Sequence, residues 1–285
     1  MGISFKEVSH FYPSLKKKQY TIALDSINLD INEKNEFIAV VGKTGSGKST
    51  LMQHMNALML PSKGNVCIFD NIITPNKKKN PKLKEVRKRV GFVFQFPEYQ
   101  LFEETVLKDI MFAPLNFGYK EDEAKAKALE IAKLLRIEHL LNKSPFNLSG
   151  GQMRKVAIAG ILSYDPDILL LDEPTRGLDP KASKDIMDLF YDIHKTTGKT
   201  IIMITHDMNL VYEYSNRVVV MNDSKLVYDG NKVTLFKESI YKDNHLTKPE
   251  VLKMIDYLNE KLGYNIDYYT YTLDELIKKV VLKHE

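Results

Sequence analysis

Nine consecutive residues, 42–50, have the composition of a loop that binds phosphate. They read Gly-Lys-Thr-Gly-Ser-Gly-Lys-Ser-Thr, which fits a glycine, four residues and then Gly-Lys-Ser. The glycines let the backbone turn sharply and bring its N–H groups toward an anion. The lysine can reach the terminal phosphates of a nucleotide, and the next hydroxyl can hold Mg²⁺. We expect a nucleotide site formed by Gly42, Lys43, Thr44, Gly45, Ser46, Gly47, Lys48, Ser49 and Thr50.

This loop stands between a strand and a helix, the two elements that would position it. Residues 37–41 are an apolar run of strand length, and residues 51–60 have helical composition and end before Pro61. A helix that begins at the loop points the positive end of its dipole at a bound anion. A glycine-rich turn that matches by chance is the alternative, and the flanking strand and helix argue against it.

Two carboxylates follow another apolar strand. Residues 168–171 are four aliphatic residues, and Asp172 and Glu173 come directly after them. Ligands of open α/β sheets bind at the carboxyl edge of parallel strands, and the aliphatic run argues against an acidic pair in a surface turn. Asp172 would help to hold Mg²⁺, and Glu173 could polarise an attacking water. The apolar strand at 199–205 ends in His206, which we expect at the same edge.

A second phosphate-type sequence lies more than a hundred residues after the first. Residues 149–152, Ser-Gly-Gly-Gln, precede a helix expected at 153–163. Such a helix start can bind an anion, although Ser149 could equally be a plain N-cap. This sequence has no lysine or metal partner of its own. We therefore infer that two chains pair head to tail, so that Ser149 of one covers the nucleotide held by Lys48 of the other.

Three further features lie near the expected strand ends. Tyr12 ends the first strand, where it could stack on a base or be a partly buried strand-end residue. Gln95 ends the strand 91–95 and opens the aromatic stretch 96–102, which either packs inward or offers an apolar surface to a partner. Asp179 is a candidate N-cap for a helix that starts at Pro180.

The order of these elements predicts an α/β fold. Strands alternate with helices except at about 96–165, where a mostly helical subdomain is inserted. From residue 231 the pattern changes to helices at 249–262 and 272–283, joined by a segment with four tyrosines. We therefore expect an α/β domain over 1–230 and a helical extension over 231–285.

Composition sets limits on the function. The net charge of +4 over 285 residues is too small to indicate nucleic-acid binding. The single cysteine, Cys67, excludes an internal disulfide, and its apolar surroundings predict a buried core thiol. We find neither a signal-peptide pattern at the start nor an apolar run long enough to span a membrane. Alone, the chain is expected in the cytosol or on a membrane surface.

Taken together, these motifs resemble those of ATP-binding cassette (ABC) ATPases over residues 1 to about 230. More narrowly, residues 95–106 and 149–160 resemble the ATPase subunits of energy-coupling factor (ECF) transporters, which drive the uptake of vitamins and transition-metal ions. Arg176 stands where the family often has a small residue. In that family's terms the motifs are the Walker A loop (42–49), the Q-loop Gln95, the signature sequence (148–152), the Walker B strand (168–173), the D-loop Asp179 and the switch histidine His206.

The resemblance implies a role for each motif residue. Glu173 would be the general base and His206 would steady the γ-phosphate, with Lys48 and Gln95 also catalytic. Mg²⁺ would be held by Ser49 and Gln95, with Asp172 behind. The other contacts to ATP would come from Tyr12 on adenine, from the loop 42–50, and from Ser149, Gly150, Gly151, Gln152 and Asp179.

The resemblance also implies partners. Residues 101–106, Leu-Phe-Glu-Glu-Thr-Val, are similar to the second of two ATPase paralogues, which suggests a heterodimer. A transmembrane coupling protein and a substrate-binding membrane protein would complete the transporter at the cytoplasmic face of the cell membrane. The alternatives are the ATPase of a conventional ABC importer and a soluble ABC ATPase acting on ribosomes or DNA. Soluble members usually carry two cassettes or a long coiled-coil insertion, and this chain has one cassette and no such insertion.

Overall fold

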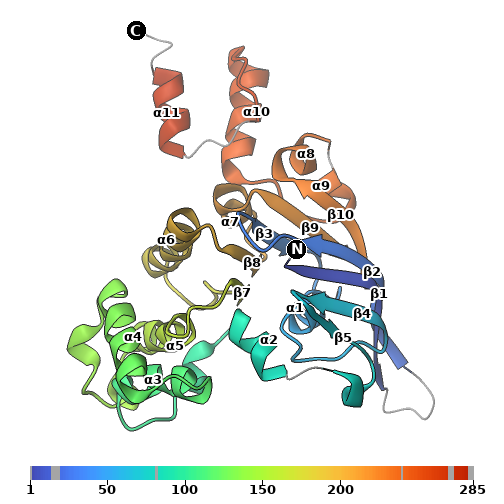
Figure 1. Ribbon diagram of the computed structural model, residues 1–285. Coiled ribbons are helices and arrows are strands. Elements are labelled where there is room, and N and C mark those ends of the chain that lie inside the picture. Colours follow the sequence, from blue (N-terminus) through green and yellow to red (C-terminus); the bar gives the residue numbers. More distant parts are fainter. Residues whose placement is uncertain (1, 14–19, 81–82, 239, 269–272, 282–285) are drawn as a thin grey trace.

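The computed structural model describes residues 2–13, 20–80, 83–238, 240–268 and 273–281 (Figure 1). Within them, a four-stranded sheet has the strand order β2-β1-β4-β5, and all its pairs are antiparallel. The β1–β2 pairing runs from Ile3 opposite Ile31 to Pro13 opposite Tyr20. The strands are β1 (Ile3–Pro13), β2 (Tyr20–Ile31), β4 (Lys63–Ile68) and β5 (Asn71–Ile73).

A second, six-stranded sheet has the order β10-β9-β3-β8-β7-β6. It is parallel from β9 to β6, and β10 pairs antiparallel with β9 at one edge. The expected α/β architecture is thus confirmed. The strands are β3 (Phe37–Val41), β6 (Val90–Val93), β7 (Ile168–Asp172), β8 (Thr200–Ile204), β9 (Arg217–Asn222) and β10 (Lys225–Asn231).

The aliphatic runs that predicted the central strands are buried on both faces. In β8, Ile202 and Ile204 pack in the cluster that includes helix α1 (Lys48–Met55). Ile201 and Met203 pack in the cluster that includes α6 (Pro180–Thr197). Strand side chains alternate between faces, so a strand covered by helices on both sides must be apolar throughout. The helices on the two faces of the sheet therefore hold the ends of β7 and β8 in place.

The remaining helices fall into an inserted group and a C-terminal group. The sequence did not predict α2, α7, α8 or α9, which are short and give too few turns for a periodic pattern. Four 3₁₀ turns lie at Lys77–Lys79, Pro97–Gln100, Glu138–Leu140 and Pro145–Asn147. The helices are α2 (Leu83–Arg89), α3 (Val106–Asn116), α4 (Glu121–Leu134), α5 (Gly150–Leu162), α7 (Met208–Tyr214), α8 (Lys232–Lys237), α9 (Ile240–Asp243), α10 (Glu250–Leu262) and α11 (Leu273–Val281).

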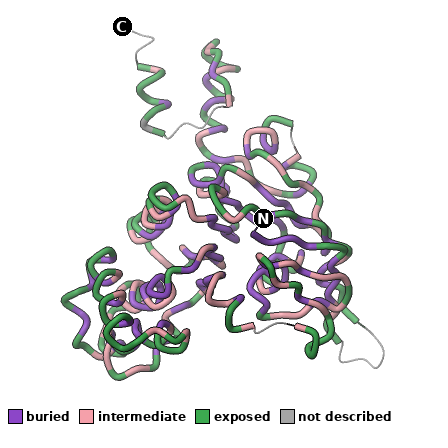
Figure 2. Tube along the Cα trace, in the orientation of Figure 1, coloured by how far each residue is buried: buried purple, intermediate pink, exposed green. Residues whose placement is uncertain are grey.

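Helices α3, α4 and α5 surround a hydrophobic core of their own, away from the large sheet (Figure 2). On α4, Ala124, Ala128 and Ala132 recur every four residues and are fully buried. Small residues on one helical face let the neighbouring helices approach closely. This group therefore packs as a unit that carries the start of α5 with it.

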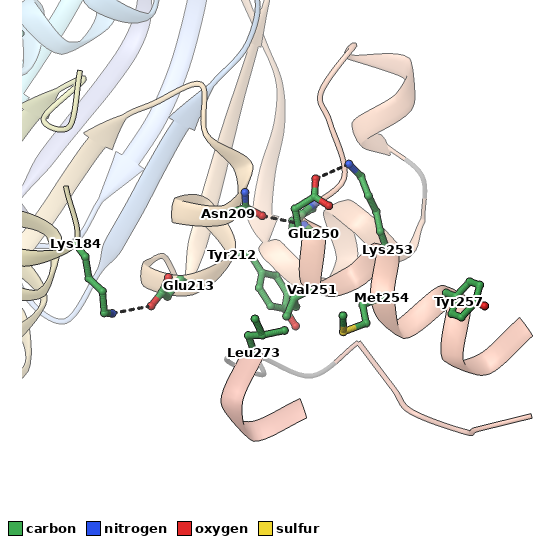
Figure 3. Close-up of a pocket in the computed structure, with 11 residues that line it drawn as sticks. Lys184, Asn209, Tyr212, Glu213, Glu250, Val251, Lys253, Met254, Tyr257 and Leu273 are labelled. Carbon is green, nitrogen blue, oxygen red and sulfur yellow. Dashed lines mark hydrogen bonds and ion pairs between the residues drawn. The ribbon is translucent and has the colours of Figure 1, made fainter. Parts of the chain in front are cut away.

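The C-terminal helices dock on α7 (Figure 3). The backbone N–H of Glu250 donates to Asn209 Oδ1 at 2.8 Å, and Leu252 and Ile255 are buried with Val211. A cavity of about 820 Å³ lies between these elements. Two of the four tyrosines predicted to join the helices, Tyr269 and Tyr271, lie outside the described residues. None of the described helices is long and apolar enough to cross a lipid bilayer.

Cys67 departs from its prediction as a buried core thiol, because it is only half-buried. In β4 its neighbours Val66 and Ile68 are fully buried. Side chains alternate along a strand, so residues on either side of a core position point away from the core. An apolar run of four residues in the sequence did not reveal that only one face of this sheet is covered here.

His54, in the last turn of α1, is fully buried. Its Nδ1 lies 2.7 Å from the Thr50 carbonyl, so Nδ1 carries a proton and donates. Its ring packs edge-on against His10, with the centroids 4.9 Å apart. The pKa of His54 is lowered to about 4, mainly by burial and to a smaller extent by the nearby His10, against the Thr50 hydrogen bond. The folded protein therefore keeps this imidazole neutral.

We predict that His54 destabilises the protein in mild acid. Its pKa is about 4 when folded and about 6.5 when unfolded. Below pH 6.5 the unfolded chain therefore binds a proton that the folded chain does not bind. This contribution lowers the free energy of unfolding by about 2 kcal/mol between pH 7 and pH 5. Denaturant unfolding at both pH values measures it. We expect His54→Gln to lose this part of the pH dependence and the exposed His139→Gln to keep it; equal pH slopes in wild type and His54→Gln would refute the assignment.

Candidate nucleotide-binding site

Three glycines shape the loop between β3 and α1. Gly42 and Gly47 have φ angles of +142° and +101°, and a Cβ on them would lie 2.0 Å from the Met221 carbonyl oxygen and 2.2 Å from that of Ala23. Backbone from two other strands therefore presses on the loop where only glycine fits. Gly45 has a φ of +81°, and a Cβ there would meet nothing within 4 Å. Backbone atoms of neighbouring strands thus pack against one side of the loop, and the other side is open.

Lys48 is the first residue of α1 and is buried. Its Nζ donates to the carbonyl oxygens of Gly42 and Lys43, each at 2.7 Å. Burial lowers the pKa of Lys48, while the charges of Glu173 and Asp172 act in the opposite direction. An ammonium in this position can exchange the two carbonyls for the oxygens of a phosphate.

The carboxyl ends of β7 and β8 bring the remaining catalytic candidates together. Glu173 follows β7 with a φ of +51°, and its N–H donates to the Ile204 carbonyl at the end of β8, at 3.0 Å. His206 Nε2 lies 3.0 Å from Glu173 Oε1. The pair is not aligned as a hydrogen bond, so Glu173 Oε1 is a buried acceptor without such a partner among the described residues. That oxygen is available to accept a proton from water.

Burial shifts the pKa values of this group. It raises the pKa of Asp172, against the Lys48 charge and the Ser49 hydroxyl, which lower it. It also raises the pKa of Glu173, with the Asp172 charge acting in the same direction. It lowers the pKa of His206, and Lys48 lowers it further. Glu173 is therefore a stronger base than a free glutamate, and His206 is neutral at pH 7.

A cavity of about 380 Å³ gathers most of the predicted residues, while two larger cavities hold none of the phosphate-loop residues. Chemistry rather than volume therefore identifies the site. Gly42, Lys43 and Ser46 belong to the loop but do not line the cavity. The predicted residues that do line it are Tyr12, Thr44, Gly45, Gly47, Lys48, Ser49, Thr50, Gln95, Asp172, Glu173 and His206.

The donor set of this cavity fits Mg²⁺. Ser49, Gln95 and Asp172 offer a hydroxyl, an amide and a carboxylate oxygen, which are the hard ligands that Mg²⁺ prefers. They come from the start of α1, the segment after β6 and the end of β7. The ion's remaining ligands in such sites are nucleotide phosphates and water.

Tyr12 borders the cavity from β1. Its hydroxyl lies 3.2 Å from Thr50 Oγ1 and donates to Met59 Sδ at 3.2 Å. Its ring packs edge-on against His10, with the centroids 4.8 Å apart. The side chain is about one-third exposed, so an anchored ring borders the cavity. Stacking on adenine remains a prediction that this geometry permits.

The signature residues lie outside the cavity, at the exposed start of α5. Ser149 Oγ accepts from the Gln152 N–H at 3.4 Å, and Gln152 Oε1 accepts from the Ser149 N–H at 3.1 Å. Ser149 is therefore an N-cap, as one of the two alternatives held. A Cβ on Gly150 or Gly151 would meet nothing within 4 Å. The backbone here is open to an approaching ligand, which leaves the anion-site alternative in place.

Asp179 also lies outside the cavity. Its Oδ1 accepts from the N–H groups of Lys181 and Ala182, each at 3.0 Å, so the predicted N-cap of α6 is confirmed. The structure of the single chain places no nucleotide contact on it.

Several cavity residues carry no motif in the sequence. Thr21, Ile22 and Ala23 line it from β2, and Arg176 lines it from the turn after β7. The β2 residues carry no motif, although the pairing of Tyr12 with Thr21 brings them to the site. From the sequence alone, Arg176 is only a departure from the family pattern and has no assigned role.

Comparison with known proteins agrees with this geometry. The ABC transporter family model matches residues 24–176. The chain is 45% identical over 285 residues to the energy-coupling factor transporter ATP-binding protein EcfA2 of Lactobacillus gasseri, covering 99% of this chain and 97% of that protein.

Solved structures give the same result. CbiO1 of Clostridium perfringens, described as part of the ABC transporter complex cbiONQ, matches with a TM-score of 0.72 and 34% identity over 92% of this chain and 95% of that one. A dimeric post-hydrolysis state of the ATP-binding cassette MJ0796 bound to ADP and Pi matches with a TM-score of 0.70 and 32% identity, over 80% of this chain and 98% of that one. With the loop, the carboxylates and the histidine assembled in one cavity, the chain belongs to the ABC transporter ATPases and, among them, to the ATP-binding proteins of energy-coupling factor transporters.

Proposed function

We propose that this chain binds ATP with Mg²⁺ and hydrolyses it to drive an ECF-type importer of vitamins or other micronutrients, including transition-metal ions. The observation that carries the proposal is the single cavity in which Lys48, Asp172, Glu173 and His206 meet. The printed names of the relatives support the transporter class. Residues 1–230 form the ATPase domain, with the helical insertion at about 96–165, and residues 231–285 form the extension that helps to hold an ATPase pair together.

The site residues act in a simple order. Lys48 leaves the Gly42 and Lys43 carbonyls and binds the terminal phosphates, while the open N–H groups of the loop hold the others. Bound Mg²⁺ would neutralise charge on the phosphates, held by Ser49 and Gln95 with Asp172 behind. Glu173 Oε1 accepts a proton from the attacking water, and this transfer is favoured by its raised pKa. His206, neutral, donates to the γ-phosphate.

The site is completed by a second ATPase chain. Ser149 and Gly151 stand exposed at the start of α5 and do not line the cavity of their own chain. Placed over the nucleotide of a partner, their N–H groups and the helix dipole would bind the phosphates from the other side. A heterodimer with a related ATPase follows from the resemblance of residues 101–106, and the dimeric state of the cassette MJ0796 supports pairing in general.

An aromatic surface next to Gln95 suits a transmembrane coupling protein. Tyr99 is 83% exposed, and Phe96 and Phe102 are also exposed. These aromatic side chains offer an apolar surface, while Leu101 within the same stretch packs inward. Phe102 meets Phe112 edge-on at 4.7 Å beside a cavity of about 380 Å³. A cytoplasmic helix of a membrane protein can bind such a groove through its apolar face. The chain would then lie on the cytoplasmic face of the membrane, with a substrate-binding membrane protein completing the complex.

We predict that Glu173→Gln separates binding from hydrolysis. The amide keeps the size of the side chain but cannot accept a proton, so turnover should fall about 100-fold or more. ATP affinity, measured by equilibrium binding of a fluorescent ATP analogue, should stay within about threefold of wild type. The exposed Glu121→Gln on α4 serves as the matched control with normal turnover. Turnover of the Glu173 variant within tenfold of wild type would remove this residue from the mechanism.

The two half-sites predict a concentration dependence. In dilute isolated subunits, the hydrolysis rate should rise more steeply than linearly with protein concentration, because only pairs are active. Lys48→Ala and Gly151→Asp should each be inactive alone. In pairs made of two copies of this chain, mixing the variants should restore activity, since one of the two shared sites then keeps both its loop and its signature. Strict proportionality to concentration, together with no recovery on mixing, would indicate a self-sufficient single chain.

The membrane partner is tested by recovery of the complex. The tagged chain, purified from its own cells in mild detergent, should bring with it a second ATPase and two unlike membrane proteins. Phe112→Glu places a charge in the groove and should lose the membrane proteins while keeping the second ATPase. Leu129→Glu, at an exposed position on α4, should keep all of them. Recovery with ribosomes instead, or equal recovery in both variants, would contradict the proposal.

A further inference from the structure

Arg176 is held over the nucleotide cavity by its backbone. Its N–H donates to the Glu173 carbonyl at 3.1 Å, and its own carbonyl accepts from Arg154 at 2.9 Å. Arg154 comes from α5, is 2% exposed, and is bound by both oxygens of Glu98. The turn that carries Arg176 is therefore fixed between the end of β7 and α5.

The Arg176 side chain reaches Gln95 across the cavity. In the amide orientation that gives both groups partners, the Gln95 oxygen accepts from Arg176 Nε at 3.0 Å and also from a terminal guanidinium nitrogen. Two N–H groups thus occupy the one oxygen that Gln95 could offer to a metal ion. Glu173 and His206 line the same cavity. A small residue in this position would leave the Gln95 oxygen without these donors.

We propose that Arg176 is a positioning residue that holds the Gln95 oxygen in the nucleotide-free protein and gives it up when Mg²⁺ enters with ATP. The inference rests on the role of Gln95 as a metal ligand in the proposed function. Entry of the metal must break two charge-assisted hydrogen bonds before Gln95 can turn to it. Arg176 therefore makes the Mg²⁺-dependent part of ATP binding weaker than it would be with a small side chain.

Two effects of the guanidinium can be separated. Its positive charge attracts the phosphates whether or not Mg²⁺ is present, and salt and solvent screen that attraction. Its hold on Gln95 matters only when the metal needs the oxygen. The ratio of the ATP dissociation constant in EDTA to that in Mg²⁺ cancels the first effect and retains the second.

The experiment measures this ratio on the full chain with a fluorescent, non-hydrolysable ATP analogue. Arg176→Ala should raise the ratio about three- to tenfold, as expected for loss of a partly exposed charged hydrogen bond. Arg176→Lys keeps the charge but not the planar fork, so it should raise the ratio while leaving affinity in EDTA near wild type. The exposed Lys181→Ala removes a nearby cation without touching Gln95 and should leave the ratio unchanged. Thermal unfolding of each variant checks that the fold is intact.

A double-mutant comparison separates the two possible failures. Gln95→Ala should lower the ratio, and adding Arg176→Ala to it should change nothing further, because the competition is gone. An unchanged ratio in Arg176→Ala, with a lowered one in Gln95→Ala, would overturn the role of Arg176 and leave the metal site standing. An unchanged ratio in Gln95→Ala would overturn the metal ligand itself and the inference with it. A raised ratio in Arg176→Ala that persists in the Gln95→Ala background would also refute the proposal.

Discussion

A buried ammonium opposite two half-buried carboxylates is the constraint around which this structure is built. Lys48, Asp172 and Glu173 lie where the loop after β3 and the end of β7 meet. Burial disfavours the charged form of each. The Lys48 charge offsets part of that cost for both carboxylates, whereas the Asp172 charge adds to it for Glu173. Glycines at 42 and 47 allow the close backbone approach that puts the lysine there. A phosphate with a divalent cation supplies the partners that this group lacks, so nucleotide binding relieves the same cost.

The signature residues 149–152 lie outside the cavity because another helical unit carries them. The signature sequence begins α5, which packs in the separate core of α3 and α4. One side chain ties that unit to the site. Arg154, five residues after Ser149, donates to Glu98 and to the carbonyls of Pro174 and Arg176. A shift of the α5 start toward a partner's nucleotide must therefore be felt at the turn after β7 and at the segment after Gln95.

Much of the site could be predicted because its parts are short sequences joined to strongly apolar strands. Strands buried on both faces are apolar throughout, so they can be recognised from the sequence alone. This holds for the run 37–41 before the loop and for the run 168–171 before Asp172. Arg176 could not be assigned, since its partner Gln95 is distant in sequence and no periodic pattern connects them. The β2 residues opposite Tyr12 were missed for the same reason. Cys67 was misjudged because an apolar run says nothing about which face of a strand is covered.

Two arginines hold the segment that follows β6, which contains Gln95 and Glu98. Arg154 fixes Glu98, three residues after Gln95, and Arg176 binds the Gln95 amide itself. The exposed aromatic residues Tyr99 and Phe102 follow at once. If Gln95 exchanged Arg176 for a metal as proposed, the buried Arg154–Glu98 pair would stay in place, because breaking it would leave a buried charge unpaired. We therefore expect a change at Gln95 to act on the neighbouring aromatic surface, where the proposed membrane partner would bind.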